Sequence, residues 1–388
     1  MDRIAGRQAI YLDNNQALEQ ACAELAFSEV LGFDSEFMRT NTYFPKPGLF
    51  QLGDGQQTFL VDPLGIDRWD SFRTLLQRES LILVIHSSSE DLGLLRSFLG
   101  VLPANLFDTQ RAAAFAGLGY SLSYQALVKN ELDVEIPKGE TRSDWLRRPL
   151  SETQLDYAAL DVEYLVEIQQ RLQAQLRERR MLEWFEADCR DLLAGVPDEM
   201  DPTAWENAYL SISSAWQLDG RALQLLQKLA FWREQEARLR NKPRSWVVKD
   251  AELQALAEKL SGQDLIDEAA IRRTGVFSSR FADREAQKLA RFLNQDREFA
   301  RPASPDLLSR PLGGAVRRQL KALQTLARER AETLDISPEL LARKKLWLEL
   351  LENVASDRLP LWPPGLDNWR RELLEPAVMA ILAKGGAE

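Results

Sequence analysis

The chain has 388 residues, of which 45% are hydrophobic and 28% charged, and its formal net charge is −10. That length predicts two or three domains, and the composition is that of an ordinary globular protein. No apolar run approaches the roughly 18 residues that a membrane span requires, and Met1-Asp2-Arg3 begins no secretory pattern. We therefore expect a cytoplasmic protein with no membrane partner.

Cysteine and histidine usage excludes several classes of mechanism. Cys22 and Cys189 are the only cysteines, which excludes a disulfide framework and a cysteine-rich zinc site. His86 is the only histidine, so a His-x-x-x-His zinc site is excluded, and we expect this residue to be structural. The nucleotide-binding motifs GxxxxGK[ST] and GxGxxG are absent. An enzyme with this composition would depend on carboxylates and on oxygen-ligated metals.

Strands and helices alternate over the first 180 residues. Apolar runs, periodicity and capping residues predict strands at 8–12, 30–37, 49–52, 58–61 and 81–86, and helices at 15–26, 69–78, 88–99 and 151–180. Asn14 and Asp108 are expected N-caps, and Ser151-Glu152-Thr153-Gln154 is a capping box. The alternation predicts an α/β fold in which helices flank a sheet.

The rest of the chain is expected to be helical and repeated. Leu226-Gln227-Lys228-Leu229-Ala230 returns as Leu323-Gln324-Thr325-Leu326-Ala327, and Pro243 with its apolar and basic turn returns at Pro338. We predict an α/β domain at 1–180, an acidic linker at 181–214, a helical domain at 215–297, a linker at 298–314 and a second helical domain at 315–388.

Charge is distributed unevenly between these parts. Residues 1–180 carry 18 basic and 26 acidic side chains, whereas residues 216–388 carry 30 and 25. The acidic residues 1–180 are suited to metal binding, and the mildly basic residues 216–388 are suited to binding the phosphate backbone of a nucleic acid.

Two acidic residues follow an apolar run where a buried strand is expected. Asp34 and Glu36 come after Val30-Leu31-Gly32-Phe33, and the two-residue period of a strand places both side chains on one face. At about 4 Å and an effective dielectric constant near 20, such a pair costs on the order of 4 kcal/mol. It therefore needs protons or a cation, and Mg²⁺ and Mn²⁺ prefer oxygen ligands. The alternative is that Asp34 forms a cap and Glu36 points into water.

Two further acidic residues join this pattern. Asp91 follows the apolar strand at 81–86, and Asp161 lies four residues after Tyr157 on a predicted helix, so the latter two share a helix face. A Tyr-x-x-x-Asp spacing alone is most often structural, and its significance here depends on the other acidic residues.

In combination these residues carry a family resemblance. Phe33-Asp34-Ser35-Glu36-Phe37, Ser89-Glu90-Asp91-Leu92 and Tyr157-Ala158-Ala159-Leu160-Asp161 resemble, in order, the three exonuclease motifs of the DEDD superfamily in its tyrosine subtype. Three further motifs resemble the bacterial ribonuclease D family specifically, namely Arg39-Thr40-x-Thr42-Tyr43 with Gly48-Leu49-x-Gln51-Leu52, Phe107-Asp108-Thr109-Gln110 and Ser143-Asp144-Trp145. The helical repeats resemble HRDC domains. The resemblance implies a ribonuclease H-like exonuclease domain with a mixed sheet, followed by two all-α HRDC-like domains.

The resemblance also implies an activity. The expected enzyme is a 3′→5′ exoribonuclease that releases nucleoside 5′-monophosphates from RNA, with tRNA precursors that have single-stranded 3′ ends as substrates. Asp34, Glu36, Asp91 and Asp161 would hold two divalent cations, Mg²⁺ or Mn²⁺, and Tyr157 would orient the attacking water. Two alternatives stay open, namely a DNA 3′→5′ exonuclease of the same superfamily and a non-catalytic nucleic-acid-binding protein.

A second set of residues is expected to bind RNA. Single-stranded ends should pass the loop at 39–48, where Tyr43 and Phe44 offer stacking surfaces, and the HRDC-like domains should bind the body of the RNA. The expected residues are Arg39, Thr40, Tyr43, Phe44, Lys138, Arg142, Arg233, Arg238, Arg240, Lys242 and Arg244. No obligate protein partner is evident. Because every expected metal ligand precedes Arg180, we expect residues 1–197 to fold and to trim short RNA alone.

Overall fold

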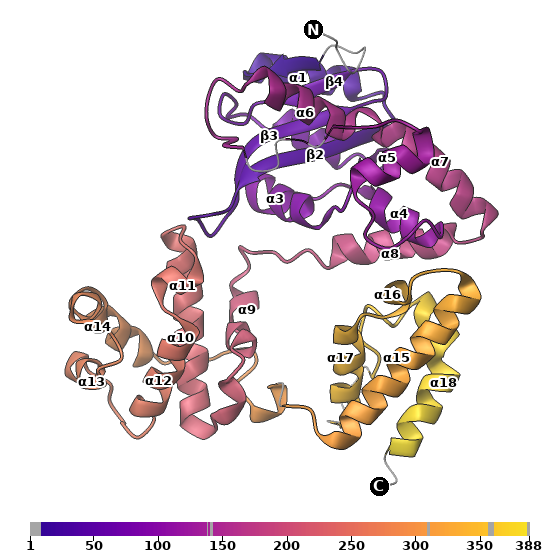
Figure 1. Ribbon diagram of the computed structural model, residues 1–388. Helices are drawn as coiled ribbons and strands as arrows, with labels where there is room; N and C mark the ends of the chain where they lie inside the picture. Colours follow the sequence, from indigo (N-terminus) through magenta and orange to yellow (C-terminus); the bar gives the residue numbers. More distant parts are fainter. Residues whose placement is uncertain (1–8, 138, 140–142, 309–310, 356–360, 386–388) are drawn as a thin grey trace. The chain divides into compact units, whose positions relative to one another are not determined.

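The computed structural model describes residues 9–137, 139, 143–308, 311–355 and 361–385 (Figure 1). The chain forms two compact units, each assembled from separate stretches of sequence. Unit 1 contains residues 1–38, 46–196 and 312–388, and unit 2 contains residues 39–45 and 197–311. Within the described ranges, no helix combines the length and the apolar character that crossing a membrane requires.

A mixed sheet lies among the helices of the α/β part of unit 1 (Figure 1). Its strands are β1 (Ala9–Leu12), β2 (Val30–Met38), β3 (Lys46–Gly53), β4 (Thr58–Val61), β5 (Ile82–Ile85) and β6 (Asn105–Asp108), in the spatial order β1-β4-β3-β2-β5-β6. β2, β3 and β4 form an antiparallel meander. β1 pairs with β4 in parallel, and β5 pairs in parallel with both β2 and β6. The α/β fold with a mixed sheet is therefore confirmed.

The helices of this part begin where the sequence places capping residues. They are α1 (Asn15–Leu25), α2 (Asp70–Leu76), α3 (Ser89–Leu99), α4 (Thr109–Phe115), α5 (Tyr124–Leu132), α6 (Glu152–Glu163), α7 (Leu165–Glu178) and α8 (Leu182–Ala194). The side chains of Asn14 and Asp108 accept backbone N–H groups at the start of α1 and α4, and Ser151 forms a capping box with Gln154. These three caps agree with the sequence prediction.

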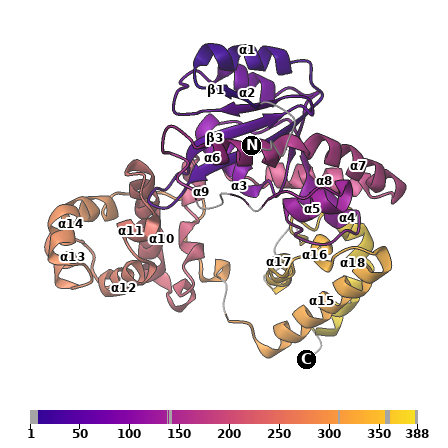
Figure 2. The same cartoon turned by 45° about the horizontal axis from the view of Figure 1, so that its top comes forward.

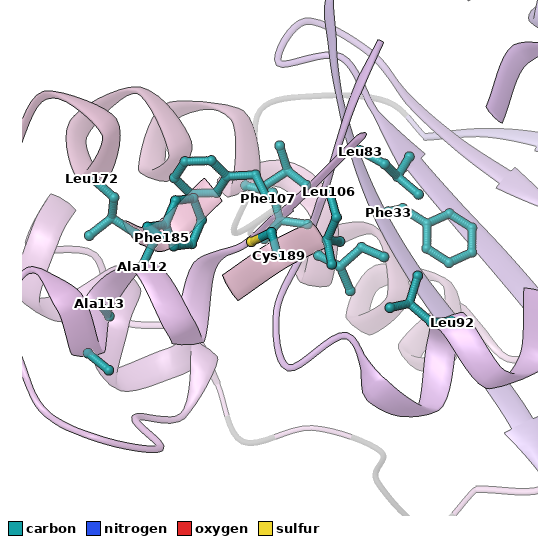
Figure 3. Close-up of a cluster of buried hydrophobic side chains, with 14 of the residues drawn as sticks. Phe33, Leu83, Leu92, Leu106, Phe107, Ala112, Ala113, Leu172, Phe185 and Cys189 are labelled. Atoms are coloured by element: carbon teal, nitrogen blue, oxygen red, sulfur yellow. The ribbon is translucent and has the colours of Figure 1, made fainter. Parts of the chain in front are cut away.

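Helices cover both faces of the sheet. On one face, the Phe50 ring packs against Phe72 of α2 and Phe98 of α3, at centroid distances of 6.1 and 5.9 Å. On the opposite face, Gly53 of β3 admits α6, because a Cβ there would lie 3.0 Å from the Val162 carbonyl oxygen. The missing side chain lets α6 run close across β2 and β3. Figure 3 shows part of the buried core, including side chains from β2, β5, β6, α3 and α8.

The helix expected over 151–180 is interrupted at Tyr164, which separates α6 from α7. The backbone N–H of Tyr164 donates to the hydroxyl of Tyr124 at 3.3 Å, instead of continuing the helical ladder. A side chain that inserts into the ladder in this way bends a helix. The sequence contains no glycine or proline at this point, so the break could not be read from the chain itself.

The second helical repeat packs on the α/β part of unit 1. Its helices are α15 (Gly314–Leu334), α16 (Pro338–Leu341), α17 (Lys344–Ala355) and α18 (Trp369–Gly385), which form a small bundle (Figure 2). Trp369 stacks on Trp184 of α8, with ring centroids 4.6 Å apart and planes 6° from parallel. Asp188 of α8, only 3% exposed, forms ion pairs with Arg111 of α4 and Arg370 of α18.

This packing differs from the expected separation of the two regions. The segment expected as an acidic linker, 181–214, begins with α8, whose buried Asp188 requires cations from both sides. Residues 1–197 alone would leave this face of α8 uncovered.

Unit 2 contains the first helical repeat. Its α-helices are α9 (Pro202–Trp205), α10 (Gly220–Leu239), α11 (Arg244–Val247), α12 (Asp250–Leu260), α13 (Glu268–Arg273) and α14 (Ser279–Leu293). A long helix, a proline, a four-residue helix and a third helix follow one another in α10–α12 and again in α15–α17. The repeat read from the sequence therefore has a structural counterpart.

Candidate active site

Three carboxylates gather where β2 faces α6. Asp34 and Glu36 lie at alternate positions of β2, and Asp161 comes from the last turn of α6. One carboxylate oxygen of each residue lies within 4.8 Å of the others. Such a group of oxygen ligands is of the kind that hard divalent cations prefer. Glu36 therefore does not point into water, as the alternative interpretation expected, but lies beside Asp34 and Asp161.

Asp91 supplies a fourth acidic group from the first turn of α3. β5 runs parallel to β2, and the chain turns at Ser87, with φ of +63°, before α3 begins. The Asp91 carboxylate accepts a hydrogen bond from the hydroxyl of Ser35, the residue between the two β2 acids. Asp91 thus lies outside the group of three in this conformation, but its negative charge helps to raise the pKa of Asp34.

Burial raises the pKa of all four carboxyl groups and is the largest cause for each of them. Together with nearby negative charges, it brings the pKa of Glu36 to about 8 and the pKa values of Asp91 and Asp161 to about 7. The pKa of Asp34 lies well above its ordinary range, because burial is joined by the charges of the other three carboxylates. A divalent cation would displace these protons and neutralise the cluster. The residues present therefore fit an oxygen-ligated metal.

Tyr157 lies one helical turn before Asp161 and forms a hydrogen bond with its carboxylate. Burial, followed by the charges of the neighbouring carboxylates, raises the pKa of Tyr157, so the phenol stays neutral and remains a hydrogen-bond donor. Its ring packs against Trp145 at a centroid distance of 6.2 Å.

Gly139 is a site residue that sequence reasoning missed. A Cβ built at Gly139 would lie 1.8 Å from the ring of Tyr157, so only glycine leaves that ring in place. A single glycine in a polar stretch of sequence gave no signal, since the contact joins positions 18 residues apart.

His86 has the structural surroundings expected of it. One ring nitrogen contacts the Thr109 hydroxyl at 2.9 Å, and the other contacts the Leu122 carbonyl oxygen at 3.1 Å. Burial lowers the pKa of His86, which keeps the imidazole neutral.

Tyr43 does not present the free stacking surface that the sequence suggested. Its side chain is 8% exposed, its hydroxyl donates to Glu199 at 2.7 Å, and it accepts from Arg244 at 2.8 Å. The guanidinium groups of Arg238 and Arg244 lie 4.4 and 5.0 Å from the ring centroid. The loop residue Tyr43 is thus part of the core of unit 2, because its ring and hydroxyl satisfy buried charges there.

Several of the expected RNA-binding arginines are also occupied within unit 2. Arg233 is 2% exposed and pairs with Asp250 at 2.5 Å, while Arg238 pairs with Glu199 at 2.7 Å and with Glu234. The sequence did not indicate these partners, apart from the i, i+4 spacing of Glu234 and Arg238.

The remaining residues of this set differ in accessibility. Arg39, Thr40, Lys242 and Arg244 are exposed, Phe44 is half-buried, and Arg240 pairs with Glu285 at 2.9 Å. Lys138 and Arg142 lie outside the described residues.

Comparisons with known proteins agree with this geometry. The family model described as "3'-5' exonuclease" matches residues 9–177, and the HRDC domain model matches residues 222–265. Ribonuclease D of Pseudomonas paraeruginosa is 37% identical over 372 residues, covering 96% of this chain and 97% of that protein. Ribonuclease D of Escherichia coli is 32% identical over 381 residues, with 96% and 97% covered.

A solved structure matches over nearly the whole chain. The crystal structure of Escherichia coli RNase D, described as an exoribonuclease involved in structured RNA processing, has a TM-score of 0.82 and 31% identity. The match covers 98% of this chain and 99% of that one. The chain therefore belongs to the ribonuclease D family of 3′→5′ exoribonucleases.

Proposed function

We propose that Asp34, Glu36, Asp91 and Asp161 hold two divalent cations, Mg²⁺ or Mn²⁺, and that this site releases nucleoside 5′-monophosphates from RNA 3′ ends. The observation that supports this most strongly is the group of three carboxylates within 4.8 Å of one another. Asp34, Glu36 and Asp161 would hold one cation. Asp91 and Asp34 would hold the other, and the charge of Asp91 is one of the causes that raise the pKa of Asp34.

The size of the reaction barrier favours catalysis by metal ions. Phosphodiester hydrolysis needs roughly 20 kcal/mol of transition-state stabilisation, whereas one general base contributes about 3–5 kcal/mol. Divalent cations at the acidic site would supply Lewis-acid chemistry, lowering the pKa of water and stabilising charge on the phosphate and on the leaving 3′ oxygen.

The side chains of the protein would hold the cations in place and orient the attacking water. The acidic side chains project from β2, α3 and α6, and sites on regular elements of this kind are held more rigidly than sites on loops. Tyr157 would orient the attacking water, since its neutral hydroxyl is a donor held beside Asp161. A phenol with a raised pKa is a poor base, so a positioning hydrogen bond is the role that suits it.

The proposed substrates are tRNA precursors with single-stranded 3′ ends. The exposed part of the basic turn in unit 2 supports contact with RNA: Lys242 lies 5.7 Å from the ring centroid of Trp246, which is 61% exposed. A cation beside an exposed aromatic ring is a surface on which an unpaired base can stack.

A location in the cytoplasm stays a prediction from the sequence.

The test compares Asp34→Asn with Asp156→Asn. Asp156 lies on α6 and is exposed, so its substitution is a matched control for the loss of one carboxylate. With saturating Mg²⁺ or Mn²⁺ and 5′-labelled oligomers, we expect Asp34→Asn to abolish release of mononucleotides while RNA binding persists. We expect Asp156→Asn to be unchanged. Wild-type turnover by Asp34→Asn would refute the metal site, and equal hydrolysis of a matched DNA oligomer would refute the preference for RNA.

A further inference from the structure

Gln51 is placed directly beside the acidic site. It lies on β3, where it is the cross-strand partner of Asp34 on β2. Directly paired residues of antiparallel strands point to the same face, with Cβ atoms about 4.5–5.5 Å apart. That face is covered by α6, which carries Tyr157 and Asp161. The Gln51 side chain therefore lies under α6 beside Asp34.

The Gln51 amide has no partner in the part of the chain that the structure describes. Its side chain is 0% exposed, and neither its nitrogen nor its oxygen makes a hydrogen bond to a described residue. Its other cross-strand neighbour is Leu60, which offers no polar side chain. A buried, unpaired amide in a native structure calls for an explanation such as a catalytic role or an ion that is not seen.

Gln227 shows what a satisfied buried glutamine looks like in the same chain. It is 2% exposed, and its nitrogen donates to the carbonyl oxygens of Glu206 and Arg301 at 3.1 and 2.7 Å. Its oxygen accepts the backbone N–H of Ala303 at 2.9 Å. Burial of a glutamine thus comes with full pairing in unit 2 but not beside Asp34.

We propose that Gln51 is a positioning residue for Asp34. When a cation is bound, the amide N–H of Gln51 donates to the Asp34 carboxylate and holds it in its cation-binding orientation, a bond that the metal-free structure lacks. Contact with RNA is excluded for a side chain with no exposed surface. The Asp34 carboxylate is the polar group on the adjacent strand, opposite Gln51 in the register. Outer groups that orient metal ligands in this way commonly change metal affinity 10- to 100-fold. The inference rests on the proposed metal site.

The experiment compares Gln51→Leu with Gln227→Leu in the full-length protein. Mn²⁺ binding is measured by electron paramagnetic resonance, and stability of the metal-free protein by urea unfolding. For Gln51→Leu we expect the Mn²⁺ dissociation constant to rise about 10- to 100-fold. We expect its unfolding midpoint to stay the same or rise, because an unpaired polar group is replaced by an apolar one of similar size. Gln227→Leu should show the reverse, with a lower midpoint and unchanged Mn²⁺ affinity.

RNA hydrolysis, measured as a third readout, distinguishes a loss of Asp34 positioning from general damage to the fold. Excess Mn²⁺ should restore RNA hydrolysis by Gln51→Leu, because Asp34 itself remains. Unchanged Mn²⁺ affinity, or a lower unfolding midpoint, would overturn the proposal, since a lower midpoint means that the amide has a partner in the metal-free fold. Gln51→Met provides a second variant of similar shape, and failure of both variants to fold would also overturn it. If the wild-type protein binds no Mn²⁺, or Asp34→Asn binds it normally, the metal site itself is wrong, and that result does not depend on Gln51.

Discussion

Arg370 is expected to stabilise unit 1 through its buried ion pair with Asp188. The side chains of Arg370 and Asp188 are 5% and 4% exposed, and Arg111, the second partner of Asp188, is 12% exposed. The Arg370 Nε also donates to the Leu340 carbonyl oxygen at 2.7 Å. Replacing Arg370 by leucine keeps an apolar stem but removes one of two cations from a buried carboxylate.

The size of the effect follows from this burial. Removing one partner of a buried ion pair costs about 3–5 kcal/mol. Arg111 continues to pair with Asp188, which favours the lower end, whereas the lost bond to Leu340 adds to the cost. We therefore expect Arg370→Leu to lower the unfolding free energy by about 3 kcal/mol. With a urea dependence of about 1–3 kcal/mol per molar, the midpoint should fall by roughly 1–3 M.

The neighbouring residue supplies the control. Arg371 is 42% exposed and pairs with Asp367 and Glu375, each 41% exposed, so Arg371→Leu should cost less than about 1 kcal/mol. Urea unfolding can be followed by tryptophan fluorescence, because Trp184 and Trp369 are stacked beside the ion pair. Equal midpoints for the two variants would refute the reasoning. For the same reason the fragment 1–197, expected from the sequence to fold alone, should now be markedly less stable than the full chain.

Three further predictions concern the acidic site. Tyr157→Phe should lower kcat while leaving Mn²⁺ affinity nearly unchanged, because the variant loses the orienting hydroxyl and keeps every carboxylate; full kcat would make Tyr157 purely structural. Gly139→Ala should also lower kcat, because the added methyl group would overlap the Tyr157 ring. Gly262→Ala is the control and should leave kcat unchanged, because no atom lies within 4 Å of its added Cβ. Similar kcat values for the two variants in steady-state assays would contradict this prediction. In the metal-free protein, the unfolding free energy should fall as the pH rises from about 5 to 8. The reason is that carboxyl groups such as Glu36, with a pKa of about 8, stay protonated in the folded state but are ionised in the unfolded chain. Each such proton lowers the unfolding free energy by about 1.4 kcal/mol per pH unit. Urea titrations across this range should show the slope, and saturating Mg²⁺ should remove it; a flat profile without metal would show that the carboxyls are already ionised.

The acidic site could be anticipated because its geometry is local. Strand alternation places Asp34 and Glu36 on one face, and the helical spacing of four places Tyr157 beside Asp161. Both relations depend only on the period of a single element. That these elements meet in space could be expected only from the order of the motifs and the family resemblance.

The unit 2 interactions could not be anticipated, because they depend on distant parts of the chain. Tyr43 is separated from Glu199 and Arg244 by 156 and 201 residues. An arginine in a basic turn has the same sequence appearance whether it is solvated or paired with a buried acid. Arg233 and Arg238 therefore looked like an RNA grip, whereas they neutralise Asp250, Glu199 and Glu234.

The division of the chain also constrains how its parts could be exchanged. The chain passes between unit 1 and unit 2 four times, after residues 38, 45, 196 and 311. A domain joined through one linker can be replaced or lost by a single recombination event. Here, exchange of unit 2 must carry the short loop at 39–45 together with the segment at 197–311, since the loop supplies Tyr43 to the core of unit 2. Chimeras that transplant the segment at 197–311 alone should leave a cavity where the Tyr43 side chain packs. A compatible donor protein must therefore match the recipient at the loop 39–45 as well as at 197–311.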